Sequence, residues 1–544
     1  MSLKSIRLVI AQLNLLTGDI AGNTAQIINS IKRARDDHSA DIIIFPELSI
    51  TSYPPEDLLH RPALFEQVNQ SLQQILPFSK DIGVIIGYPQ NLDGKLYNSC
   101  SLMLEGDIKS TYHKQKLPNY GVFDEKRYFE PGLETCLINI NEITTALSIC
   151  EDIWDPYLCI KAQAGGANLM ININASPFHI NKKIHRQDML KKRVAESNLN
   201  IIYVNLVGGQ DELVFDGGSM AINDNGEIEF HAPQFQDGLY LTEFTFDNHG
   251  QFSNPENISQ TILSEEESIY QALVLGVKDY VRKNKFEGAI IGLSGGIDSA
   301  LTLCIAVDAL GHENVEALMM PSRYTSKISI EDARAEANNL NVKYDEISID
   351  DLYQKFYESL SPLFKDLPMD TTEENIQARC RGTILMAVSN KTGKLVLATG
   401  NKSEMSVGYA TLYGDMAGGF APLKDIPKTL VYKLANWRNR QSAAIPQRII
   451  DRPPSAELRE DQRDDDSLPP YDILDPILER YIEKDQTPEE IISAGFDTET
   501  VQKVSRLVDN NEYKRRQAAP GVRISQRAFG RDRRYPITSG YIEF

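Results

Sequence analysis

Glu47, Lys114 and Cys150 are residue types that together can cleave an amide bond. Glu47 follows the apolar run DIIIFP, Lys114 lies in YHKQK, and Cys150 ends the run ALSIC. A thiol is weakly ionised at neutral pH, so the sulfur of Cys150 needs a base, which Glu47 would supply. The thiolate would attack the amide carbon while the Lys114 ammonium stabilises the tetrahedral oxyanion. Glu47 would then return the proton to departing ammonia and activate water against the thioester.

A second chemical motif is the hexapeptide SGGIDS at 294–299, between the apolar run AIIGL and the helical run ALTLCIAVDAL. Adjacent glycines permit positive φ, and backbone N–H groups with the positive end of a helix cradle phosphate oxygens. The hydroxyls of Ser294 and Ser299 add donors, and Asp298 can hold Mg²⁺ on the phosphates. No Lys follows the glycines, which argues against phosphoryl transfer of the usual P-loop type. The alternative is an ordinary strand–helix turn.

The elements that position these residues form two α/β domains. Short β-rich runs alternate with amphipathic helical stretches in residues 1–245, and strand ends are where α/β proteins commonly place functional groups. Residues 246–263 are polar and predict a linker. Residues 264–544 predict a second set of elements, which starts with a helix and the strand before SGGIDS. Further strands are predicted at VEALMMP, VKYDEISI and KLVLATG. The charged segment 455–472 predicts a mobile surface loop.

Composition excludes several classes of protein. The chain has 544 residues and a formal charge of −20, which argues against a general nucleic-acid binder. Its hydrophobic fraction of 42% is enough to bury full cores and excludes a wholly disordered chain. The six scattered cysteines without a CxxC pair suit a reducing cytosol. We find no signal peptide or membrane span in the sequence and expect a soluble, cytoplasmic protein.

The motifs of the second domain resemble those of known enzymes. SGGxDS resembles the nucleotide loop of the N-type ATP pyrophosphatases, which release pyrophosphate and attach AMP to a substrate oxygen. ENIQAR, ATGNKSE, YGD and PLKDIPKT follow one another as they do in NAD synthetases. The resemblance implies a parallel-sheet α/β adenine-nucleotide domain that uses ATP, Mg²⁺ and deamido-NAD⁺, and a homo-oligomer joined through this domain.

This resemblance also implies the ligand residues. ATP would be bound by Gly292, Leu293, Ser294, Gly295, Gly296, Ile297, Asp298, Ser299, Thr399, Lys428 and Ser455. Deamido-NAD⁺ would be bound by Asn375, Glu404, Asp415 and Lys514, and Mg²⁺ by Asp298 and Glu404. Lys428, Ser455 and Lys514 would reach in from loops that close over the site. Taken singly, Glu404 and Lys428 are compatible with solvated surface residues, and Asn375 with a helix cap. Arg379 and Arg381 are weaker candidates for phosphate contacts.

The first domain resembles the nitrilase superfamily, with Glu47, Lys114 and Cys150 as its catalytic set. Glu125 matches the supporting carboxylate of that superfamily, which orients the lysine or the substrate amide. The resemblance implies an α-β-β-α sandwich. PNYGVFDEKRYF is similar to the glutaminase domain of glutamine-dependent NAD⁺ synthetases, which makes Tyr120, Ser176 and Lys182 glutamine ligands, with Glu151 a further candidate contact. Asn181 stands where other members carry Gly. The alternatives are an inert buried thiol at Cys150, a strand-ending turn at Ser176 and a solvated Lys182–Lys183 pair.

The two resemblances together imply one reaction, in which glutamine supplies ammonia for the ATP-dependent amidation of deamido-NAD⁺, the final step of NAD⁺ biosynthesis. Free ammonia is mostly NH₄⁺ at neutral pH, so a shielded path between the sites would keep the reactive NH₃ concentrated. Two other hypotheses stay open. One is a carbon–nitrogen hydrolase whose second half merely binds a nucleotide, and the other is a degenerate or regulatory nucleotide-binding protein.

Overall fold

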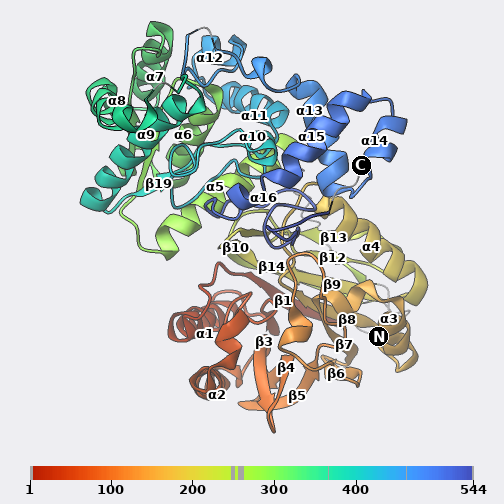
Figure 1. The fold of residues 1–544 in the computed structure, drawn as a ribbon. Coiled ribbons are helices and arrows are strands. Elements are labelled where there is room, and N and C mark those ends of the chain that lie inside the picture. The colour runs from red at the N-terminus through yellow and green to blue at the C-terminus, as the bar shows by residue number, and fades with distance from the viewer. Residues whose placement is uncertain (1–3, 247–251, 255–262, 366, 461, 542–544) are drawn as a thin grey trace. The chain divides into compact units, whose positions relative to one another are not determined.

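The computed structural model describes residues 4–246, 252–254, 263–365, 367–460 and 462–541 (Figure 1). The chain divides into two compact units, Met1–Leu263 and Ser264–Phe544. Most of the expected linker at 246–263 lies outside the described residues. Within that stretch, Phe252–Ser253 forms strand β15 and pairs with β14 of the first unit. None of the described helices is long and apolar enough to cross a membrane.

The first unit is built on two large sheets. One has the order β15-β14-β1-β2-β3-β4-β5, and the other has the order β13-β12-β9-β8-β7-β6. The first sheet contains β1 (Lys4–Gln12), β2 (Ile42–Ile44), β3 (Gly83–Leu92), β4 (Lys95–Leu104), β5 (Asp107–His113), β14 (Gly238–Phe246) and β15. The second contains β6 (Cys136–Ile140), β7 (Ile143–Ile149), β8 (Leu169–Asn174), β9 (Asn200–Asn205), β12 (Met220–Ile222) and β13 (Ile228–His231). A separate hairpin pairs β10 (Val207–Gln210) with β11 (Leu213–Asp216).

Alternation along the strands creates the layers of this unit. On β1, Ile6, Leu8 and Ile10 face a core shared with the second sheet, whereas Val9 and Ala11 face the opposite core. Helices α1 (Ile20–Asp36) and α2 (Pro62–Ile75) pack into that opposite core. Helices α3 (Pro156–Ala164) and α4 (Lys182–Ser197) cover the outer face of the second sheet. The result is the expected α-β-β-α sandwich.

The second unit contains a parallel sheet in the order β18-β17-β16-β19. Its strands are β16 (Ala289–Gly292), β17 (Val315–Met319), β18 (Lys343–Glu346) and β19 (Leu395–Leu397). From β16, the chain adds β17 and then β18 on one side, and it later adds β19 on the other side of β16. This reversal opens a crevice beyond the carboxyl ends of β16 and β19, where α/β proteins bind ligands.

Helices surround this sheet. They are α5 (Glu265–Lys283), α6 (Ile297–Leu310), α7 (Lys327–Asn339), α8 (Asp350–Phe364), α9 (Thr371–Thr392) and α11 (Lys428–Gln441). Apolar residues of α8 and α9 form a core with Ile290, Leu318 and Val396 of the strands. The expected helix at 264–285 is confirmed as α5, which begins after a Ser264 cap that accepts a hydrogen bond from the Glu267 backbone.

The remaining helices of this unit are α10 (Lys402–Val407), α12 (Gln447–Asp451), α13 (Tyr471–Leu478), α14 (Pro488–Ser493), α15 (Thr498–Asn510) and α16 (Glu512–Arg515). Of these, α10, α13, α14 and α15 contribute to a second core of this unit, centred on Leu474, Ile477, Val501 and Val504. Single turns are η1 (Glu56–His60), η2 (Leu76–Ser79), η3 (Glu125–Arg127), η4 (Cys150–Trp154), η5 (His312–Asn314), η6 (Asp464–Asp466) and η7 (Glu479–Glu483).

Candidate active sites

Lys114 lies between two carboxylates in the interior of the first unit. Its Nζ donates to Glu47 Oε1 at 2.7 Å and to Glu125 Oε1 at 2.8 Å. Glu47 follows β2, Lys114 follows β5 and Glu125 begins η3, so strand ends and one turn bring together residues distant in sequence. Asn98 Nδ2 also donates to Glu47 Oε1 at 2.7 Å, and Tyr53 donates its hydroxyl to Glu125 Oε1 at 3.0 Å. The cluster is a fixed, buried network of hydrogen bonds.

The charges within this network shift its pKa values. Burial lowers the pKa of Lys114, but the carboxylates of Glu125 and Glu47 outweigh it and hold that pKa well above its ordinary value. Burial raises the pKa of Glu125 to about 7, against the opposing charge of Lys114. Lys114 therefore stays charged at neutral pH and can stabilise an oxyanion.

Cys150 stands at the junction of β7 and η4, at the end of the buried strand predicted from the sequence. Its φ is +46°, a left-handed conformation that is uncommon outside glycine and is often found at functional sites. Burial raises the pKa of its thiol, Glu47 raises it further, and Lys114 opposes the rise. The free thiol is therefore protonated at neutral pH and requires a base to become a nucleophile.

Asp152 links the residues that follow Lys114 (the lysine segment, 115–116) to the turn at Cys150 (the cysteine turn, 149–150). It was not identified from the sequence. Its Oδ1 accepts from the backbone N–H of Gln115 at 3.0 Å and of Lys116 at 2.8 Å. Its Oδ2 accepts from the Ile149 N–H at 3.0 Å and the Tyr112 hydroxyl at 2.8 Å. One fully buried carboxylate thus fixes the residues that follow Lys114 to the residue that precedes Cys150.

The predicted glutamine ligands lie around this network. Ser176 follows β8, and the N–H of its neighbour Ala175 donates to Glu47 Oε2 at 2.8 Å. Tyr120 is 60% exposed and its hydroxyl donates to Glu151 Oε1 at 2.9 Å. Lys182 is not simply solvated, because its Nζ lies 4.8 Å from the centre of the Trp154 ring.

The departure from the family pattern at Asn181 has a backbone explanation. Asn181 precedes Lys182, the first residue of α4, and adopts φ +66° and ψ 2°. Glycine takes this left-handed conformation without strain, and asparagine is among the other residues that tolerate it. The substitution therefore preserves the turn that delivers Lys182.

The SGGIDS motif forms the predicted turn between β16 and α6 in the second unit. Gly295 has φ +76°, and a Cβ there would lie 2.3 Å from the Ser329 carbonyl oxygen, so only glycine fits. The hydroxyls of Ser294 and Ser299 lie 3.0 Å apart, and Ser299 Oγ donates to the Gly296 carbonyl. These hydroxyls hold the turn together in addition to lining a cavity.

Lys428 lies between two carboxylates at this turn. Its Nζ is 2.5 Å from Asp298 Oδ2 and 3.1 Å from Glu404 Oε1, and Asn401 Nδ2 donates to Asp298 Oδ1 at 2.9 Å. Burial raises the pKa of Glu404 to about 7, with Lys428 opposing and Asp298 adding. Lys428 is the first residue of α11, and its side chain is 2% exposed. The placement of Lys428 in a closing loop or on the solvated surface was therefore wrong.

The donor set fits a magnesium ion. Oxygens of Asp298 and Glu404 converge on the Lys428 ammonium, and Mg²⁺ is commonly bound by one or two carboxylates together with substrate phosphates. Among the described residues no group of three or more metal-ligating side chains gathers. A cation here would therefore take its remaining ligands from water and from the oxygens of a bound phosphate.

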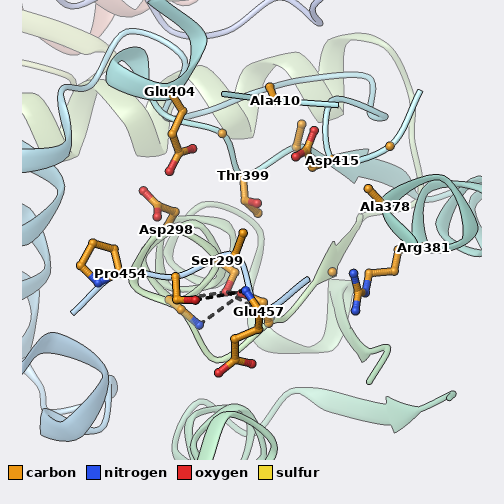
Figure 2. Close-up of a pocket in the computed structure, with 18 of the residues that line it drawn as sticks. Asp298, Ser299, Ala378, Arg381, Thr399, Glu404, Ala410, Asp415, Pro454 and Glu457 are labelled. Atoms are coloured by element: carbon orange, nitrogen blue, oxygen red, sulfur yellow. Dashed lines mark hydrogen bonds between the residues drawn. The ribbon is translucent and has the colours of Figure 1, made fainter. Parts of the chain in front are cut away.

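A cavity of about 500 Å³ opens beside the turn (Figure 2). Of the predicted ATP ligands, all but Gly295 line it, and Thr399 projects into it from the end of β19. Glu404, Asp415 and Arg381 line it as well. The ATP ligands inferred from resemblance thus share one surface with three further polar residues.

The other predicted dinucleotide ligands meet at the loop 408–411. Asn375 Oδ1 accepts from Thr411 Oγ1 at 2.7 Å, and Asp415 Oδ1 accepts from the Thr411 N–H at 2.7 Å. Lys514 lies in α16 rather than a loop, and its Nζ donates to the carbonyls of Gly408 at 2.7 Å and Ala410 at 2.9 Å. Burial raises the pKa of Asp415 to about 6. Asn375 is not a helix cap, because α9 begins at Thr371 after Asp370.

Most of the described residues in the segment 455–472, predicted to be a mobile surface loop, are exposed, but a few of them are buried. Ser455 lines the cavity and its hydroxyl donates to the Gln462 carbonyl at 2.5 Å. Asp464 is 4% exposed and accepts from the Tyr471 hydroxyl at 2.9 Å. Just before the segment, Arg452 donates to the Gly295 carbonyl at 2.8 Å. The buried Asp464 thus has a partner within the unit, which the sequence pattern does not reveal.

The sequence analysis also missed other residues of the two sites. Tyr53 and Asn98 carry no local motif, and only the packing of β2, β4 and η3 brings them to Glu47 and Glu125. Asp152 follows Cys150 by two residues, and Asn401 precedes Glu404 by three residues within ATGNKSE, so their nearness in sequence could have identified both.

Comparisons with known proteins agree with this arrangement. Residues 7–253 match the carbon-nitrogen hydrolase family and residues 269–518 match the NAD synthase family. The glutamine-dependent NAD(+) synthetase of Acinetobacter baylyi is 48% identical over 543 residues, which are 99% of each chain. That of Thermotoga maritima is 44% identical over 99% of this chain and 100% of its own.

Solved structures extend the likeness to three dimensions. A glutamine-dependent NAD⁺ synthetase from Acinetobacter baumannii in complex with adenosine diphosphate has a TM-score of 0.80 and 46% identity, covering 99% of this chain and 100% of its own. One from Cytophaga hutchinsonii has a TM-score of 0.83 at 23% identity, over 99% and 98% of the two chains, and shows the shared fold. The chain belongs to the glutamine-dependent NAD⁺ synthetase family.

Proposed function

We propose that this protein converts deamido-NAD⁺, ATP, glutamine and water into NAD⁺, AMP, pyrophosphate and glutamate. The observation that carries the proposal is the presence of two different chemical sites in one chain. One is a thiol beside a carboxylate–lysine network, and the other is a phosphate-binding turn with two carboxylates at a cavity. Full-length relatives that are glutamine-dependent NAD(+) synthetases support the same reaction.

In the first unit, the geometry of the network supports the following roles. Glu47 takes the proton of Cys150, and the sulfur attacks the carboxamide carbon of glutamine. Lys114 stabilises the oxyanion, and Glu47 gives the proton to the leaving ammonia. Glu47 then activates the water that hydrolyses the thioester to glutamate. Glu125 holds Lys114 in place, while Tyr120, Ser176, Lys182 and Glu151 bind the rest of glutamine.

In the second unit, the SGGIDS turn binds the phosphates of ATP, and Asp298 and Glu404 would hold Mg²⁺, which would offset phosphate charge there. Lys428 supplies a further positive charge at the same point. Asn375, Asp415 and Lys514 bind deamido-NAD⁺ so that its nicotinate carboxylate meets the α-phosphate of ATP.

Ammonia released in the first unit attacks the adenylated nicotinate and displaces AMP. Because the reactive form is NH₃ and not NH₄⁺, transfer that avoids equilibration with solvent favours the reaction. We further propose that the enzyme is a homo-oligomer joined through its synthetase unit and that it works in the cytoplasm. The six scattered cysteines, all free, suit that reducing compartment.

The test follows nitrogen from glutamine. With amide-¹⁵N glutamine, ATP, Mg²⁺ and deamido-NAD⁺, we expect the label in the nicotinamide group of NAD⁺. Cys150→Ala is expected to abolish this reaction and to spare NAD⁺ formation from ammonium. Glutamine hydrolysis without NAD⁺ formation from either nitrogen source would favour a hydrolase that merely binds nucleotide. Absence of both activities would favour a regulatory nucleotide-binding protein.

A further inference from the structure

Arg186 is a buried cation that contacts Ser176, a predicted glutamine ligand. It lies on α4, is 1% exposed, and has Cys150 among the groups that act on its charge. Its Nη1 donates to both oxygens of Asp216, at 2.8 and 3.0 Å. Its Nη2 donates to the Ser176 carbonyl at 2.7 Å. The planar guanidinium therefore ties Ser176 to Asp216 in a fixed direction.

Both ends of this link are themselves held. Asp216 ends β11, and its Oδ2 accepts from Gln234 Nε2 at 2.9 Å. Asn205 Oδ1 accepts from the Ser176 N–H at 2.9 Å, and Asn205 Nδ2 donates to the Ser176 carbonyl at 3.2 Å. The backbone of Ser176 is thus fixed on both sides, one residue from the N–H group that donates to Glu47.

The same guanidinium also sets how the Ser176 hydroxyl can bond. Arg186 Nε and Nη2 lie 3.3 and 3.2 Å from Ser176 Oγ. Arginine cannot accept a hydrogen bond, so Ser176 Oγ is the acceptor and keeps its own hydrogen to donate. Tyr203 on β9 is a neighbouring hydroxyl able to compete for that hydrogen. A hydroxyl held in this way recognises an acceptor group, and a carboxylate is the strongest acceptor on glutamine.

We propose, as an extension of the glutamine-dependent function, that Arg186 is a positioning residue for the amide donor. Held by Asp216, it orients Ser176 so that its hydroxyl donates to the α-carboxylate of glutamine. The site thereby selects a free amino-acid amide over the same molecule with a neutral end. Arg186 itself does not contact the substrate.

The experiment measures NAD⁺ formation by the full chain with L-glutamine, with L-glutaminamide and with ammonium as nitrogen sources. For Arg186→Gln we expect the KM for L-glutamine to rise roughly ten- to a hundredfold, as for the loss of a hydrogen bond to a charged group. The kcat changes less, and the preference for L-glutamine over L-glutaminamide shrinks towards one. Arg186→Lys does not restore the preference, because a lysine cannot make the forked contacts. The ammonium-driven rate stays unchanged.

Matched variants separate this role from folding. Arg193 is buried on the same helix and donates to the Trp154 carbonyl at 3.2 Å, so Arg193→Gln is expected to lose stability and keep the wild-type KM. Tyr203→Phe is expected to keep the preference for L-glutamine, and loss of that preference would overturn the assignment of the Ser176 hydrogen to the substrate. If Arg186→Gln does not fold, Ser176→Ala must show the same loss of preference.

An unchanged KM and preference in folded Arg186→Gln would overturn the proposal, as would a fall in kcat alone, which would place the effect at Glu47. An unchanged preference in Ser176→Ala would overturn it too. Failure of the broader function looks different, because the wild-type chain would then form no NAD⁺ from glutamine.

Discussion

The two units each place a buried lysine between two carboxylates, but they differ in access to solvent. Around Lys114, the side chains of Glu47 and Glu125 are 0% and 5% exposed. Around Lys428, the side chains of Asp298 and Glu404 are 16% and 18% exposed and face the cavity. The first cluster is closed and keeps a permanent ammonium for an oxyanion. The second is open, so its carboxylates remain available to an arriving cation and polyphosphate. The two clusters have similar charges, so their different exposure to solvent explains why one suits oxyanion stabilisation and the other suits binding of a cation and a polyphosphate.

Removing each lysine gives the largest expected difference. Lys114→Met leaves two buried carboxylates unpaired and should cost about 3–5 kcal/mol of the free energy of unfolding. Lys428→Met should cost less, because water reaches its partners. Lys428→Met should have the broader effect on activity. Lys114→Met abolishes only glutamine-driven NAD⁺ formation, whereas Lys428→Met abolishes the ammonium-driven reaction as well. Denaturant unfolding and the two assays check this, and equal stability losses would contradict the comparison.

The open cluster should depend on magnesium and the closed cluster should not. Asp298→Asn and Glu404→Gln are each expected to raise the Mg²⁺ concentration for half-maximal ammonium-driven synthesis by roughly ten- to a hundredfold. Glu125→Gln, a carboxylate-to-amide change in the closed cluster, serves as the control and should leave that concentration unchanged. A magnesium titration at saturating ATP measures it. An unaltered titration in Asp298→Asn would remove this carboxylate from the proposed metal site.

The closed cluster should also depend on its anchor at Asp152. Asp152→Asn exchanges one acceptor oxygen for a donor facing backbone N–H groups, so the lysine segment and the cysteine turn should separate slightly. We expect glutamine-driven kcat to fall about tenfold, because small displacements of reacting groups are costly, with the ammonium-driven rate unchanged. Asp155→Asn, at the cap of α3, is the control. Wild-type glutaminase activity in Asp152→Asn would mean that the anchor is dispensable.

Glu336 is a buried carboxyl that contrasts with the lysine-paired carboxylates of the two clusters. Its replacement is expected to have the smallest effect on activity. Burial raises its pKa to about 8, and its Oε2 has no hydrogen-bond partner. The folded protein holds this proton up to about pH 8, whereas the unfolded chain releases it near the ordinary glutamate pKa of 4.5. The free energy of unfolding therefore decreases as pH rises between these values, by on the order of a few kcal/mol.

Glu336→Gln should remove that part of the pH dependence and leave synthesis intact. Urea unfolding of the wild type and the variant at pH 5 and pH 8 measures it. Parallel losses of stability in both proteins between these pH values would show that Glu336 is not the titrating group.

Local pattern predicted more of the fold than of the site. The apolar strand before SGGIDS, the helix after it and the α5 helix follow from hydrophobic periodicity and capping, which are short-range properties. Lys428 and Asp464 are buried, which the sequence did not indicate because charged residues in such stretches are typical of a solvated surface. Asp298, Glu404 and Tyr471 neutralise or bind these charges, and only the folded chain brings such partners close.

The sequence by itself determined the α/β class, the phosphate-binding turn and the candidate nucleophile, because each depends on neighbouring residues in the chain. Tertiary structure decided that Lys114 joins Glu47 to Glu125, that Asp152 anchors the cysteine turn, and that Arg186 fixes Ser176. Those contacts connect residues from separate strands and loops, and their energies exist only where water has been excluded. A single sequence does not show which charged residues are buried, and their burial together gives these charged residues their strong interactions in the two sites.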